Sequence, residues 1–187
     1  MPSIGSISSS EMSQPSTSQY TPLSTGQEGT DIEVELMERR YKKAVDLMGQ
    51  QKFGEAVPHL RGTLNALKGS NEGLVFESAP RREEVQLLLA KAFSKNDPKC
   101  EEAESILREV YKSPESKPLE RFSAAHFLAQ LLANLHPQDC SEAKLICLTA
   151  VKGRNTTLGR ADPKTYESIA LLASICQISN DSDREIW

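Results

Sequence analysis

From residue 32 onward, apolar side chains recur every three or four positions, which is the spacing of one face of an α-helix. A first segment over about 32–50 places Met37 and Tyr41 on such a face, and a second begins near Gly54. Only residues 50–52 separate the two. So short a connection between two amphipathic helices predicts an antiparallel helical hairpin.

The same pattern recurs twice and then ends in a single helix. The five further stripes cover about 85–93, 103–111, 122–135, 143–151 and 166–176. The second helix of each pair aligns without gaps at an alanine, and these alanines are Ala56, Ala103 and Ala143, spaced by 47 and 40 residues. A period of this size in paired helices is typical of an α-solenoid. We therefore predict an all-α fold, a right-handed solenoid of about seven helices over residues 31–187.

The first 30 residues have a different composition from the rest of the chain. Thirteen of them are Ser or Thr, three are Pro, and the few apolar residues follow no period. Such a segment buries too little surface to offset its ordering entropy, so we predict a disordered tail over residues 1–30. A phosphorylated regulatory arm is the alternative function for it. At the other end, a last helix would start near Ser182, yet the sequence stops at Trp187. Two interpretations stay open: Trp187 folds back to cap the seventh helix, or the array is truncated at its C-terminus.

Two short motifs resemble a known repeat. A helix of small apolar residues, a turn and then an aromatic residue three positions before Ala, as in Phe53 to Ala56, resembles the tetratricopeptide repeat. Residues 158–166, followed by Leu172-Ala173, resemble its kinesin-light-chain variant, although Asp162 stands where that variant has His. The repeats are also similar to those of filamentous-fungal proteins. This resemblance implies stacked helical hairpins and a protein-binding function.

Composition excludes several functional classes. Acidic residues outnumber basic ones by 26 to 22, giving a net charge of −4, whereas proteins that grip phosphate backbones are usually basic. No apolar run approaches the roughly 20 residues of a membrane span. The N-terminus lacks the basic and apolar regions of a secretory signal. We therefore expect a cytoplasmic protein that binds neither nucleic acid nor membrane, with its four cysteines reduced.

Catalytic and metal-binding motifs are missing from the sequence. It contains no phosphate-binding glycine loop, no Gly-x-Ser-x-Gly, no His-Glu-x-x-His and no Cys-x-x-Cys. The three histidines fall in different hairpins or loops, and His136 with Cys140 and Cys147 matches no zinc spacing. We therefore predict a protein that is not an enzyme and that uses neither metal nor cofactor.

The remaining candidate is a binding groove. In stacked hairpins the first helix of each pair lines a concave surface, which here is polar and weakly basic with one hydrophobic corner. This surface suits an extended peptide with one acidic group and one apolar anchor. The residues predicted to contact the partner are Tyr41, Lys91, Lys95, His126, Gln130 and Asn134.

Other interpretations of the groove stay open. An unused solvent-facing stripe is one of them. Binding of a chaperone C-terminus is disfavoured, because the lysines and asparagines that hold such a carboxylate in the family are replaced here by Tyr41, Val45, Ser123 and Phe127. The alternative function is that of a mainly structural terminal repeat segment of a larger signalling ATPase-type protein.

Overall fold

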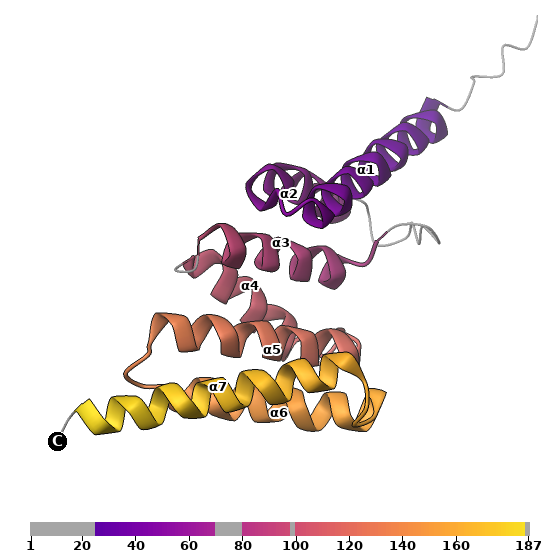
Figure 1. Cartoon of the computed structure of the whole chain (residues 1–187). Helices are drawn as coiled ribbons and strands as arrows, with labels where there is room; N and C mark the ends of the chain where they lie inside the picture. The colour runs from indigo at the N-terminus through magenta and orange to yellow at the C-terminus, as the bar shows by residue number, and fades with distance from the viewer. Residues whose placement is uncertain (1–24, 70–79, 98–99, 186–187) are drawn as a thin grey trace, which may run out of the picture.

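A computed structural model describes residues 25–69, 80–97 and 100–185 of the 187-residue chain. This part contains seven helices and no strand (Figure 1). The helices are α1 (Thr25–Gly49), α2 (Phe53–Gly69), α3 (Arg82–Asn96), α4 (Glu101–Lys112), α5 (Pro118–Leu135), α6 (Ser141–Leu158) and α7 (Pro163–Glu185).

Each helix packs against the next one in the chain, so that α1–α2, α3–α4 and α5–α6 form hairpins and α7 lies against α6. The first helices of successive hairpins also touch, because α5 packs against both α3 and α7. The hairpins are stacked along one axis, with α1 and α2 at one end and α6 and α7 at the other (Figure 1). The predicted all-α array of helical hairpins is confirmed.

The core lies between neighbouring helices and is built from small and branched apolar side chains. Ala56, Ala103 and Ala143 are 0%, 0% and 1% exposed, so the three alanines aligned from the sequence do lie where helices approach closely. Leucines such as Leu60 and Leu107 are fully buried beside them. Each buried leucine of this kind stabilises the fold by about 2 kcal/mol relative to an exposed one.

Local sequence signals fix several helix ends. Pro118 occupies the first position of α5, and the carboxylate of Glu120 accepts a hydrogen bond from the Lys117 backbone N–H at 2.7 Å. At the start of α7 the Asp162 carboxylate accepts the Lys164 N–H at 2.8 Å, so this aspartate serves as a helix N-cap. Pro58 lies inside α2, where it removes one backbone donor without ending the helix.

The N-terminal boundary differs from the expected one. Helix α1 begins at Thr25, within the segment predicted to be a tail over residues 1–30. The rest of the predicted tail, residues 1–24, lies outside the described residues.

Arginine–glutamate pairs link the second helices of successive hairpins, and we call them the Arg–Glu ladder. Arg61 of α2 pairs with Glu102 of α4, and Arg108 of α4 pairs with Glu142 of α6. Each arginine lies five residues after the aligned alanine of its own helix, and each glutamate lies one residue before the alanine of the next helix. The position that would continue the ladder from α6 is Leu148, which is 38% exposed.

Candidate functional site

The predicted groove residues meet in part at a surface pocket between α3 and α5. Its volume is about 220 Å³. Three of its lining residues, Lys95, Gln130 and Asn134, were predicted to contact a partner. The full lining is Ser94, Lys95, Phe127, Gln130, Leu131 and Asn134, and we call this the α3–α5 pocket. Its lining thus combines two amide side chains, a cation and an aromatic ring.

Lys91 belongs to the same surface through its contact with the aromatic ring. Its Nζ atom lies 5.9 Å from the ring centroid of Phe127, within the range of a cation–π interaction. Because Lys95 is one helical turn further along α3, the two ammonium groups flank one side of the pocket. The pocket can therefore offer positive charge, hydrogen-bonding amides and an apolar surface to one ligand.

Tyr41 lies at a different point of the stack. Its hydroxyl donates a hydrogen bond of 2.7 Å to the Glu84 carboxylate, which joins α1 to α3. Burial and this carboxylate raise the pKa of Tyr41 far above its usual value, so the phenol stays neutral. Glu84 precedes Lys91 by seven residues, a distance of about 10 Å along α3. Tyr41 is thus outside the α3–α5 pocket and bound to a neighbour.

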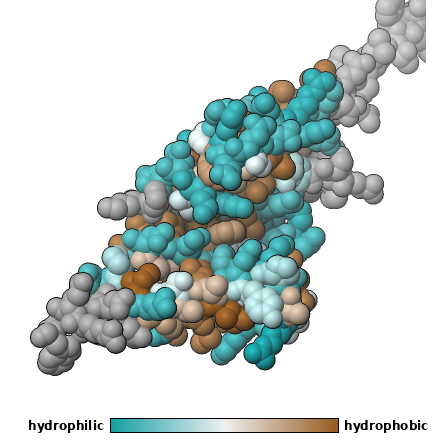
Figure 2. All heavy atoms as spheres, in the orientation of Figure 1, coloured by the Kyte–Doolittle hydropathy of each residue, from teal (hydrophilic) through white to brown (hydrophobic). Residues whose placement is uncertain are grey.

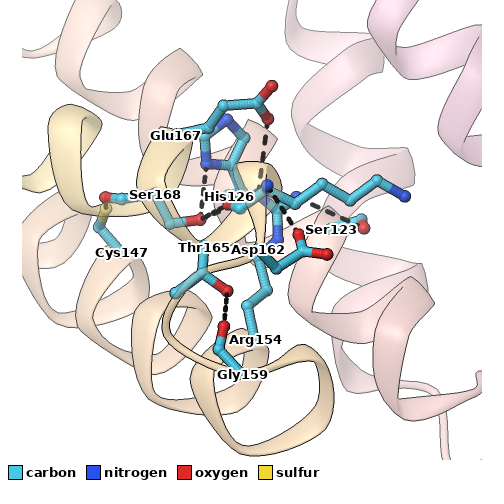
Figure 3. Close-up of polar contacts among 10 residues, drawn as sticks. Ser123, His126, Cys147, Arg154, Gly159, Asp162, Thr165, Glu167 and Ser168 are labelled. Carbon is cyan, nitrogen blue, oxygen red and sulfur yellow. Dashed lines mark hydrogen bonds and ion pairs between the residues drawn. The ribbon is translucent and has the colours of Figure 1, made fainter.

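His126 also lies outside the pocket, although we expected it in the groove. Its side chain is only 8% exposed, and its Nδ1 atom is 3.1 Å from Ser168 Oγ on α7 (Figure 3). In the predicted register, Lys91 and Lys95 lie against Gln130 and Asn134. The same register places Leu87 against His126, and for this reason His126 was predicted to lie in the groove. The contact between α5 and α7 covers this histidine instead.

A buried arginine organises the polar contacts around His126. Arg154 of α6 is 2% exposed and donates from Nη1 to the Lys164 carbonyl oxygen at 2.7 Å and to Ser168 Oγ at 2.9 Å (Figure 3). The exposed carboxylate of Glu167 lies 3.9 Å from the same nitrogen. These contacts fix α7 to α6 and α5. No sequence pattern indicated this role, because the partners of Arg154 lie on another helix.

The electrostatics of this cluster point to a structural role. Burial and the nearby charge of Arg154 lower the pKa of His126 to about 4, so the imidazole is neutral at pH 7. Burial likewise raises the pKa of the Cys147 thiol to about 11. Ser168, which lies between these groups, is fully buried. A substrate therefore cannot reach the pair of Ser168 and His126, despite its similarity to a nucleophile and its base.

Among the residues that the structure describes, no three His, Cys, Asp or Glu side chains are grouped so that they could hold a metal ion. Within the same residues, no helix combines the length and the apolar character that crossing a membrane requires.

Comparisons with known proteins identified no relative of this chain. No family model matches the chain, and neither a curated protein nor a solved structure shows significant similarity to it.

Proposed function

We propose that this protein is a non-catalytic protein-interaction module of the tetratricopeptide type, an adaptor or scaffold that binds an extended acidic peptide. The observation that carries the proposal is the α3–α5 pocket, which Lys95, Gln130 and Asn134 line together with Phe127. An extended peptide exposes its backbone amides, which Gln130 and Asn134 can hydrogen-bond.

The chemistry of the pocket selects the kind of peptide. Lys91 and Lys95 favour an acidic side chain or a carboxylate terminus, and the exposed part of Phe127 suits an apolar anchor. Opposite charge across such a contact raises both association rate and specificity. Tyr41 lies farther along the same stack, where a longer peptide would pass it.

The state of the cysteines agrees with a reducing compartment. All four cysteines of the chain are free thiols, and Cys140 and Cys147 are buried. Disulfides are rare in the cytosol, so this state supports the cytoplasmic location that we propose.

The proposal is tested with short synthetic peptides, each carrying one Asp and one Leu at varied separation, titrated into the full-length chain by fluorescence anisotropy. We expect the best of them to bind more weakly at high salt, and about tenfold more weakly to Lys95→Glu. Lys43→Glu, which changes an exposed lysine on α1, is the matched control and should bind as the wild type does.

A second variant separates charge from hydrogen bonding. Asn134→Ala should weaken the same peptide while keeping the wild-type dependence on salt, because it removes no charge. Equal affinity of the wild type and Lys95→Glu, or no binding by any peptide, would show that the α3–α5 pocket is not the binding site.

A further inference from the structure

Helix α7 carries an apolar stripe that no described residue covers. Tyr166 is 56% exposed and Ile169 is 38% exposed, and Ala173 follows on the same face of the helix with a high exposure. Figure 2 shows apolar surface gathered at the end of the stack where α6 and α7 lie. The opposite face of α7 is occupied, because Ser168 there meets Arg154 of α6.

Alignment of α7 with α5 by their repeat motifs shows which residues of α5 correspond to this stripe. Leu172-Ala173 of α7 corresponds to Leu128-Ala129 of α5, an offset of 44 residues. By that offset Tyr166 matches Phe122, whose ring lies directly against Gly153 of α6. The stripe of α7, formed by Tyr166, Ile169, Ala173 and Cys176, thus matches Phe122, Ala125, Ala129 and Leu132 on α5.

On α5 this face is buried by the second helix of its hairpin. Ala125 and Ala129 are 0% exposed and Leu132 is 3% exposed. Helix α7 therefore has the face of a first hairpin helix, but within the described residues it has no second helix. An antiparallel helix with a small residue opposite Ala173 would complete it, as α6 completes α5.

The Arg–Glu ladder ends on α6, and this end indicates which kind of helix can pack against α7. Arg61 and Arg108 each meet a glutamate of the next second helix, whereas α6 presents Leu148 at this position. A helix docked here therefore meets an apolar side chain instead of an arginine. Head-to-tail stacking of a second copy would follow α7 with α1, which is itself the first helix of a hairpin, so that arrangement does not supply the missing second helix.

We propose that the stripe of α7 pairs with the same stripe of a second copy of the chain around a twofold axis. A twofold axis perpendicular to α7 makes the two α7 helices antiparallel, which is the orientation of the two helices in each hairpin. Ala173 lies one residue from the middle of Pro163–Glu185, so an axis near it pairs the two helices over their full length. A small residue at the crossing point permits close approach. Each copy then supplies the second helix that the other lacks.

The test is the oligomeric state of the full-length chain, measured by sedimentation equilibrium over a range of concentrations. We expect a dimer, and we expect Ile169→Glu to raise its dissociation constant at least about tenfold, because the pairing would bury the new carboxylate. Leu145→Glu is the matched control, since Leu145 is 68% exposed on α6 beyond the stripe. Circular dichroism of both variants verifies that they remain helical.

A second measurement reports on the orientation. In a Cys176→Ser background, Ala173→Cys should form a disulfide-linked dimer under mild oxidation, whereas Leu145→Cys should not. A wild type that stays monomeric at all concentrations, or a dimer that Ile169→Glu leaves intact, would overturn the proposal. So would a monomer that binds a helix of a foreign protein at this face.

This inference does not depend on the α3–α5 pocket. Lys95→Glu should leave the dimer unchanged, and Ile169→Glu should leave peptide binding unchanged. Failure of either proposal can therefore be distinguished from failure of the other.

Discussion

Gly153 of α6 lies directly against the ring of Phe122 on α5, so close that a Cβ atom built on the glycine would be 2.2 Å from Phe122 Cε1. A carbon atom cannot occupy that position without displacing the ring or separating the two helices. The absence of a side chain at residue 153 is therefore a condition for the packing of the third hairpin.

We predict that Gly153→Ala destabilises the protein by about 1 kcal/mol, because overpacking outweighs the gain in helix propensity. The free energy of unfolding, measured in urea, is the test. Gly49→Ala provides the control: no atom lies within 4 Å of its Cβ position, so the same substitution there should stabilise the helix by about 0.5 kcal/mol. Stabilisation by both substitutions would contradict the observed packing.

Removal of the buried arginine should loosen α7. Arg154→Ala removes the Nη1 donor that bonds both the Lys164 carbonyl and the Ser168 hydroxyl, and we expect a loss of about 3 kcal/mol. Hydrogen exchange should show faster exchange in the first turns of α7 than elsewhere. Arg160→Ala, at an exposed position, should change neither quantity. Unaltered exchange in α7 of the Arg154 variant would show that Arg154 does not hold this helix.

The stability of the protein should decrease as the pH falls through the range between the unfolded and folded pKa values of His126. Its pKa is about 4 in the folded chain and about 6.5 in the unfolded chain, so the unfolded chain binds more protons between these values. The contribution of neutral His126 is complete above pH 6.5 and is lost as the pH falls toward 4, to a limit of about 3 kcal/mol.

His126→Gln isolates this contribution from that of the carboxylates. The variant should show a smaller decrease in unfolding free energy between pH 6.5 and 4 than the wild type. Direct titration of the His126 imidazole by NMR is the independent check. A measured pKa near 6.5 in the folded chain would exclude the buried, neutral state.

Two arginines that make similar local ion pairs should differ in their effect on stability. Arg108 bonds Glu104 on its own helix and also Glu142 on the next second helix, and its side chain is 30% exposed. Among the residues that the structure describes, Arg39 bonds only Glu35 on its own helix, and its side chain is 75% exposed. We expect Arg108→Ala to lower the unfolding free energy by about 1 kcal/mol and Arg39→Ala by less than about 0.3 kcal/mol. Equal losses would show that the contact between hairpins adds nothing.

The spacing of apolar residues was sufficient to predict the fold, because an amphipathic helix repeats its apolar positions every three or four residues along the chain. The alanines at 56, 103 and 143 and the short turns predicted which helices pair, and the structure confirms this pairing. The start of α1 was missed because residues 25–30 contain no apolar stripe.

The sites were harder to predict because they depend on contacts between distant segments. Lys95, Gln130 and Asn134 could be brought together from helical register alone, and they do share one pocket. His126 could not be placed in this way, since its burial depends on Ser168, 42 residues later in the chain. Arg154 gave no signal either, because an arginine on a polar-looking helix is usually exposed.

The Arg–Glu ladder makes the middle hairpin a modular unit. Glu102 on α4 receives the arginine of the hairpin before it, and Arg108 on the same helix reaches the glutamate of the hairpin after it. A tandem duplicate of this hairpin would carry both complementary charges, so it could be inserted without creating an unmatched junction. The first hairpin also carries both residues, Glu55 and Arg61, whereas the last hairpin has Leu148 in place of the arginine. Lengthening of the array by gene duplication is therefore easier within the first two hairpins than at the last one.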